Sequence, residues 1–160
     1  MVTAYFDGAC EPTNPGGHCT DSFVIYENDK RIYEYTEYIG SGPGMSNNVA
    51  EYQGVYNALK YLIQHNLAKN KINIYGDSKL VINQMKGIWR IKQGLYKPIA
   101  FKTLQLKQSF SNIYFDWIPR ERNKECDILT KEVLLNKGIM PHSNSPLQNN
   151  VIEEYNRLAF

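Results

Sequence analysis

The chain has 160 residues, of which 42% are hydrophobic and 21% are charged. This balance is typical of one folded domain and excludes an intrinsically disordered chain. Its three cysteines, Cys10, Cys19 and Cys126, contain no Cys-x-x-Cys pair, which argues against a zinc ribbon and a secreted disulfide scaffold. The N-terminus lacks the charge and apolar pattern of a signal peptide, and no apolar run reaches membrane-spanning length. We therefore expect a cytoplasmic protein with no membrane partner.

The first part of the chain predicts three strands. A short apolar run at residues 2–6 ends at Asp7-Gly8, and a turn-rich segment follows at residues 11–17. Residues 22–27 and 31–39 are separated by a polar turn, which is a hairpin signal. A glycine-rich break at residues 40–44 closes this region.

Helices and strands then alternate. Helices are predicted over residues 48–66, 78–86, 96–108 and 124–137, and strands over residues 71–75 and 112–118. The apolar stripe of the first helix has helical spacing, and Gly87 and Gly138 end or bend the helices before them. Leading strands followed by this alternation predict an α/β fold, with a mixed sheet flanked by helices and right-handed parallel crossovers.

The composition changes near the C-terminus, which predicts two regions. Residues 1–140 would form the domain, and residues 141–150, rich in Ser, Asn and Pro, would form a linker. Residues 151–159 predict a short amphipathic helix, with Asn150 and Glu153 spaced as a capping box. We expect this helix to dock on the domain, because a free helix of this length is marginal in water.

Charge is distributed unevenly along the chain. Residues 78–115 contain no Asp or Glu, while the cations there are Lys79, Lys86, Arg90, Lys92, Lys97, Lys102 and Lys107. Lys79, Lys86 and Arg90 would share one face of a continuous helix. Trp89 and Tyr96 lie among these cations, as suits a surface that contacts phosphates and sugars. An ordinary solvated pair of helices explains the same pattern, so the charge alone leaves both interpretations open.

Four carboxylates fall at the ends of predicted elements. Asp7 ends the first strand and Asp77 the fourth, so parallel neighbouring strands would place the two side by side at one sheet edge. Glu51 and Asp127 lie in the first turns of the long helix and the last helix. Each position also has a structural explanation: a turn, a capping box between Asn48 and Glu51, a helix cap or a favourable charge at a helix dipole.

The residues around these acids resemble the ribonuclease H type 1 family. The four matching motifs are YFDGAC (5–10) with NPGG (14–17), SNNVAEY (46–52), IYGDS (74–78) and WIPRERNKECD (117–127). They occur in the family's order and at its spacings, over about residues 1–138. The resemblance implies the ribonuclease H-like fold, a five-stranded mixed sheet with three antiparallel leading strands and then two parallel strands.

The resemblance also implies an activity, which is endonucleolytic cleavage of the RNA strand of an RNA–DNA hybrid, leaving 5′-phosphate and 3′-hydroxyl ends. Asp7, Glu51, Asp77 and Asp127 would be the catalytic and metal-binding carboxylates. Clustered acids raise one another's pKa and need cations, and two Mg²⁺ ions about 4 Å apart would supply them. Mn²⁺ would substitute. Asp7 would bridge the ions, and Glu51 would also touch a ribose 2′-hydroxyl.

The same resemblance gives a set of substrate contacts, with an RNA–DNA hybrid as the partner of a monomeric enzyme and double-stranded RNA as a second candidate. Asparagines would read the minor groove, Ser46 would contact a phosphate, and the basic stretch and its tryptophan would bind the nucleic acid. The predicted contacts are Asn14, Ser46, Asn47, Asn48, Lys86, Trp89, Arg90, Lys92 and Arg120.

The sequence departs from the family pattern in two places. Residues 117–127 contain no histidine of the kind some relatives carry before the last aspartate, and Arg120 or Arg122 would supply a cation there instead. The chain between Lys86 and Pro98 is too short for the separate basic protrusion of other relatives. Three alternatives remain: a proofreading exonuclease, disfavoured because Ala9 stands where it needs an acid; a non-catalytic binding domain; and a piece of a reverse transcriptase.

Overall fold

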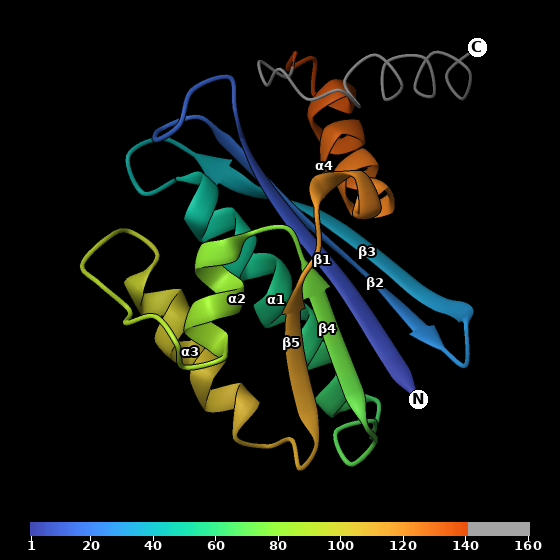
Figure 1. Ribbon diagram of the computed structural model, residues 1–160. Coiled ribbons are helices and arrows are strands. Elements are labelled where there is room, and N and C mark those ends of the chain that lie inside the picture. The colour runs from blue at the N-terminus through green and yellow to red at the C-terminus, as the bar shows by residue number, and fades with distance from the viewer. Residues whose placement is uncertain (141–160) are drawn as a thin grey trace.

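The computed structural model describes residues 1–140, in which five strands form one sheet with four α-helices around it (Figure 1). The strands are β1 (Val2–Glu11), β2 (His18–Glu27), β3 (Lys30–Ser41), β4 (Ile72–Gly76) and β5 (Ile113–Trp117). The helices are α1 (Asn47–Gln64), α2 (Lys79–Met85), α3 (Lys97–Lys107) and α4 (Lys124–Asn136), and a 3-10 turn, η1 (Arg120–Arg122), precedes α4.

The strand order β3-β2-β1-β4-β5 is that of the predicted mixed sheet. β1 pairs antiparallel with β2, which pairs antiparallel with β3, and β1, β4 and β5 are parallel neighbours. This confirms three antiparallel leading strands followed by two parallel strands. Each parallel neighbour is reached through a crossover that contains helices, as parallel pairing requires.

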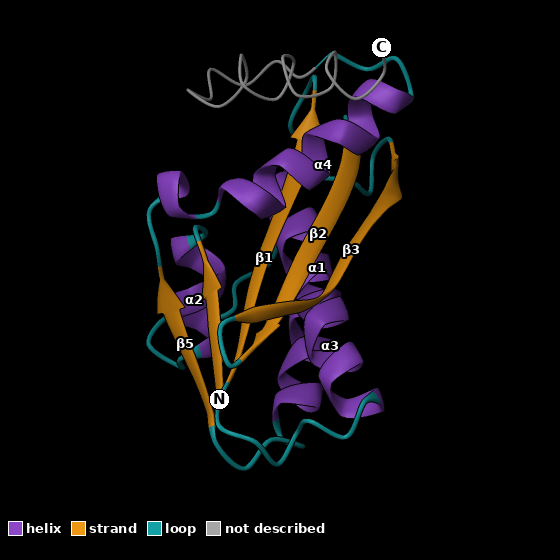
Figure 2. Cartoon of the chain, turned by 90° about the vertical axis from the view of Figure 1, so that its right-hand side faces the viewer, coloured by secondary structure: helices purple, strands orange, loops and turns teal. Residues whose placement is uncertain are grey.

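The two faces of the sheet are covered differently (Figure 2). On one face, alternate residues of β1 (Val2, Ala4 and Phe6) join α1, α2 and α3 in the main core. On the other face, α4 crosses β1, β2 and β3, and Ser22 of β2 donates a hydrogen bond to the carbonyl oxygen of Cys126 (2.7 Å). Cys126 is buried, in agreement with a packing role.

Two local expectations were wrong. β1 does not end at Asp7 but continues to Glu11, because β2 pairs with it from Glu27 back to His18. A capping box between Asn48 and Glu51 does not form, because α1 starts earlier, at Asn47, with Ser46 as its N-cap; Glu51 therefore lies beyond the first turn.

The continuous helix that would give Lys79, Lys86 and Arg90 a shared face does not form, in agreement with the helix end predicted at Gly87. Helix α2 ends at Met85, and Gly87 then adopts φ = 80°, a conformation that glycine takes at little cost. Arg90 therefore lies in the loop between α2 and α3 and not on the same helix as Lys79.

Two further points concern membrane-spanning helices and the C-terminal residues. Within residues 1–140, no helix is both long and apolar enough to cross a membrane. The predicted linker (141–150) and amphipathic segment (151–159) lie outside the described residues.

Candidate active site

Three of the four predicted carboxylates converge at one edge of the sheet. Asp7 lies in β1, Asp77 directly follows β4, and Glu51 comes from α1. One carboxylate oxygen from each lies within 4.8 Å of the others. The parallel register of β1 and β4 pairs Tyr5 with Tyr75, two residues before Asp7 and Asp77, so the sheet itself places these two side chains together.

Glycines bring α1 close enough for Glu51 to reach this edge. A Cβ atom on Gly8 would lie 2.3 Å from the backbone nitrogen of Glu51, and one on Gly54 would lie 2.7 Å from the carbonyl oxygen of Asp7. Any larger residue at these positions would push α1 away from β1. The distance between the carboxylates of Asp7 and Glu51 therefore depends on Gly8 and Gly54.

Asp127 lies beside this group on α4 but is not one of the three acids whose oxygens lie within 4.8 Å. It is buried, and its Oδ1 lies 3.9 Å from a guanidinium nitrogen of Arg120. Its charge raises the pKa of Asp7, after burial and the charge of Asp77. The structure thus places the fourth predicted carboxylate in the same electrostatic environment as the other three.

The donor atoms suit a hard divalent cation. Asp7 is 5% exposed and Glu51 is 4% exposed. Within residues 1–140, Oε2 of Glu51 and Oδ2 of Asp127 are buried without a hydrogen-bond partner. Buried charged oxygens without partners are costly, and carboxylate-only donor sets favour Mg²⁺, Mn²⁺ or Ca²⁺ over softer metals. These residues fit a divalent ion.

Electrostatics lead to the same conclusion. Burial, followed by the charges of neighbouring acids, raises the pKa of Asp7 and of Glu51 well above the usual range. Burial also raises the pKa of Asp77 and Asp127, although Asn123 and Arg120 oppose the rise at Asp77, and Lys131 and Arg120 oppose it at Asp127. A bound cation would oppose these rises in pKa, because it favours the charged form of each carboxyl group.

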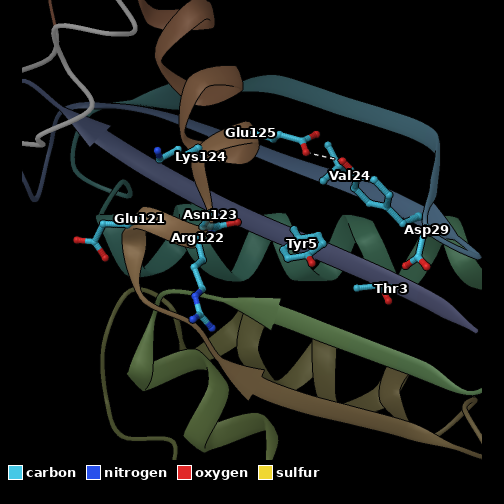
Figure 3. A pocket seen from close by; sticks show the side chains of 10 residues that line it. Thr3, Tyr5, Val24, Asp29, Glu121, Arg122, Asn123, Lys124 and Glu125 are labelled. Carbon is cyan, nitrogen blue, oxygen red and sulfur yellow. Dashed lines mark hydrogen bonds between the residues drawn. The ribbon is translucent and has the colours of Figure 1, made fainter.

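Three of these acids, Asp7, Glu51 and Asp77, line a pocket of about 560 Å³. Its lining includes Asp7, Glu51, Asp77, Asn14, Asn47, Trp117, Arg120 and Lys131. A second hollow, of about 390 Å³, lies on the sheet face below the start of α4 and contains none of the four acids (Figure 3). There Glu125 accepts hydrogen bonds from Tyr26 and Arg31. The acids therefore mark the larger pocket as the candidate active site.

The predicted substrate residues fall into two groups. Near the acids, Oδ1 of Asn14 accepts a hydrogen bond from the backbone nitrogen of Asn47 (2.9 Å), which joins the two asparagine-bearing loops. The Ser46 side chain caps α1 by accepting from the backbone nitrogen of Val49, and Asn48 lies in the first turn of α1. Asn14 and Ser46 thus have structural roles at the positions where substrate contacts are predicted.

The basic group lies apart from the pocket lining, at the end of α2 and in the loop that follows. Lys86 lies 3.6 Å from a carboxylate oxygen of Asp116, an exposed pair of small energetic value. Trp89 is 47% exposed, so its ring does not belong to the core, and Arg90 and Lys92 are exposed beside it.

Sequence reasoning missed three polar neighbours of the acids. Lys131 and Trp117 line the pocket, and Asn123 hydrogen-bonds to Asp77. Asn123, Asp127 and Lys131 are spaced by four residues, and on a helix this spacing places side chains on one face. That spacing was the available signal for Asn123 and Lys131. For Trp117, whose ring nitrogen donates to the carbonyl oxygen of Asp77, the available signal was its place at the start of the motif at residues 117–127.

Known proteins resemble this chain in sequence and in fold. A family profile described as reverse transcriptase-like matches residues 6–133. Bifunctional protein Rv2228c of Mycobacterium tuberculosis is 33% identical over 89 residues, which cover 56% of this chain and 24% of that protein. The chain thus spans about a quarter of the length of this relative.

Two solved structures match over most of both chains. Ribonuclease H1 from Halobacterium salinarum is 28% identical with a TM-score of 0.74, over 84% of this chain and 98% of that one. LC11-RNase H1, solved in complex with an RNA/DNA hybrid, is 29% identical with a TM-score of 0.74, over 82% and 95% of the two chains. The chain therefore belongs to the reverse transcriptase-like family, and it shares its fold with the solved ribonuclease H1 structures.

Proposed function

We propose that this protein is an endonuclease that hydrolyses the RNA strand of RNA–DNA hybrids with the help of two Mg²⁺ ions. The observation that carries the proposal is the convergence of Asp7, Glu51 and Asp77, with Asp127 beside them and buried carboxylate oxygens that lack partners. The similarity to LC11-RNase H1, which was solved with an RNA/DNA hybrid, supports this choice of substrate.

The residues at the pocket would have the following roles. Asp7, Glu51 and Asp77 would hold the ions, because their carboxylate oxygens lie within 4.8 Å of one another, and Asp127 beside them would assist. When bound, the ions supply an activated water and stabilise charge on the leaving 3′-oxygen. Hydrolysis of the bond between the phosphorus and the 3′-oxygen leaves a 5′-phosphate on one product and a 3′-hydroxyl on the other. Arg120, beside Asp127, supplies a permanent positive charge at the pocket and does not act as a general acid.

Substrate recognition would come from two surfaces. The joined loops that carry Asn14 and Asn47 present amides at the pocket, where they would contact bases in the minor groove. Glu51 would select RNA through the 2′-hydroxyl, the group that distinguishes RNA from DNA. The exposed cations around Trp89 would bind phosphates of the hybrid at a distance from the pocket.

The test is cleavage of end-labelled duplexes of equal sequence: RNA–DNA, RNA–RNA and DNA–DNA, each with Mg²⁺, with Mn²⁺ and with excess EDTA. We expect cleavage of the hybrid's RNA strand that needs a divalent ion, with 5′-phosphate ends on the products. Undiminished cleavage in EDTA, or cleavage of the DNA strand, would contradict the proposal. The RNA–RNA arm decides whether double-stranded RNA is also a substrate.

A further inference from the structure

Asn123 lies at the junction of the segments that carry the acids. It immediately precedes α4 and is only 2% exposed. Its side-chain nitrogen Nδ2 donates a hydrogen bond to the carbonyl oxygen of Phe6 (2.9 Å), the residue before Asp7, and lies 3.4 Å from Oδ2 of Asp77. Figure 3 shows Asn123 where the start of α4 meets β1. One amide nitrogen therefore contacts both β1 and the carboxylate that follows β4.

The backbone of Asn123 makes a third connection. Its carbonyl oxygen accepts a hydrogen bond from the backbone nitrogen of Asp127 (3.1 Å), and its own nitrogen donates to the carbonyl oxygen of Arg120 (3.0 Å). The position of Asp127 on the first turn of α4 is thus fixed relative to the same residue. Asn123 is in contact with three of the four acid-bearing segments, in β1, after β4 and in α4.

Helix capping does not explain this side chain. An asparagine at an N-cap normally accepts a hydrogen bond from the helix through its Oδ1, but the side chain of Asn123 makes no capping bond to α4. Its Oδ1 is buried without a hydrogen-bond partner among the described residues, which costs free energy of folding. The interactions of this side chain are therefore on its nitrogen, toward Phe6 and Asp77.

We infer that Asn123 is a positioning residue that holds the Asp77 carboxylate in place for metal binding, relative to Asp7 and Asp127. This inference rests on the proposed function. The amide suits the task because it donates a hydrogen bond without carrying a charge. Lysine or arginine at the same place would neutralise Asp77 and compete with the metal ion, whereas the amide leaves the negative charge of Asp77 available to the ion.

The experiment compares two asparagine side chains whose amide nitrogens both donate to carboxylates. Asn123→Leu removes the donor to Asp77. The control is Asn57→Leu, because Nδ2 of Asn57 also donates to two carboxylates, Asp21 (3.0 Å) and Glu37 (2.9 Å), away from the active site. Mn²⁺ affinity is measured by calorimetry without substrate, well below the melting temperature of each variant. Asn123→Leu should bind Mn²⁺ about 10–100-fold more weakly, as is typical when a group that orients a metal ligand is lost. Asn57→Leu should lower the melting temperature but keep the wild-type Mn²⁺ affinity.

Steady-state cleavage of the hybrid provides the second measurement. Asn123→Leu should lower kcat by about 10–100-fold with little change in KM, because the metal geometry is disturbed and the substrate contacts are not. Wild-type Mn²⁺ affinity and kcat in Asn123→Leu would overturn the inference, and so would an equal loss of Mn²⁺ affinity in Asn57→Leu. If the leucine variant does not fold, the smaller substitution Asn123→Ser also removes the amide. Its Mn²⁺ affinity and kcat then test the inference in the same way.

The outcomes also separate this inference from the proposed function. A wild-type protein that binds Mn²⁺ but cleaves no hybrid contradicts the proposed function. A wild-type protein that cleaves the hybrid, together with an Asn123→Leu variant that binds Mn²⁺ and cleaves equally well, contradicts only the role of Asn123.

Discussion

The ammonium nitrogen of Lys131 lies 3.3 Å from Oε1 of Glu11, and both side chains are buried in the wall of the acidic pocket. Lys131 follows Asp127 by one turn of α4, while Glu11 is the last residue of β1. The positive charge of Lys131 also lowers the pKa of Asp7 and Asp127, against the larger effect of burial. This lysine therefore connects the stability of the domain to the charge of the acidic pocket.

Replacing Lys131 with methionine should destabilise the protein by about 3–5 kcal/mol, because its buried ion pair with the carboxylate of Glu11 is then broken. The double variant Glu11→Gln/Lys131→Met should recover most of this loss, since neither charge is left in the interior. Urea unfolding of the three proteins measures the difference. Equal stability of Lys131→Met and the wild type would show that the pair is unimportant for folding.

Removing one negative charge from the acidic pocket should abolish most activity without loss of stability. Asp7→Asn and Asp77→Asn keep the side-chain volume but remove a metal ligand and its charge. In EDTA both variants should melt at or above the wild-type temperature. Their free energy of unfolding should rise by up to about 1 kcal/mol, because repulsion among the buried acids is relieved. Asp29→Asn, in the exposed turn between β2 and β3, is the control and should cleave normally. Near-normal cleavage by both site variants would remove these residues from the active site.

The exposed cations after α2 should contribute to binding through phosphates. Replacing Lys86, Arg90 and Lys92 with alanine should reduce the slope of log affinity against log salt by roughly 0.7–0.9 for each lost contact. Lys86 should contribute least, because Asp116 already lies 3.6 Å from it. A matched triple variant at Lys30, Lys60 and Lys69 removes the same charge from exposed positions elsewhere and should keep the wild-type slope. Equal slopes for both triple variants would assign the basic stretch to an ordinary solvated surface.

Asp21 should give the protein a pH-dependent stability that does not involve the active site. It is fully buried in β2, and burial, followed by the charge of Glu37, raises its pKa to about 9 from an ordinary value of 3.8. Between these two values the folded state binds the proton more tightly than the unfolded state does. The free energy of unfolding therefore falls as pH rises from about 4 to about 9.

Asp21→Asn should remove this dependence. At pH 8 the variant should be more stable than the wild type by at least about 1.4 kcal/mol, which corresponds to one pKa unit, and the difference should vanish toward pH 4. Thermal or urea unfolding at several pH values measures it. Glu121→Gln, at an exposed site, should show no such trend. A constant difference between Asp21→Asn and the wild type at all pH values would contradict the assignment.

Much of the fold follows from local sequence, and every element predicted within residues 1–140 occurs there. The short apolar run at residues 2–6 predicts a strand, and Ser78, the first residue of the predicted helix 78–86, caps α2 with its hydroxyl. These features depend on neighbours within a few residues, so they can be identified without the tertiary structure. The end of β1 could not be identified, because its extension to Glu11 depends on pairing with His18 and the residues after it.

For the candidate site, the sequence by itself determined which carboxylates belong to it. The motifs around them identify Asp7, Glu51, Asp77 and Asp127. Only the tertiary structure decided how they are arranged. The close approach of Gly8 to α1 brings Glu51 to Asp7, and the passage of α4 over the opposite face of the sheet brings Asn123 and Lys131 to acids far away in the chain. The physical reason is that the type of an element is set by its own periodicity and caps, whereas contacts between distant segments are set by packing, which a local pattern does not encode.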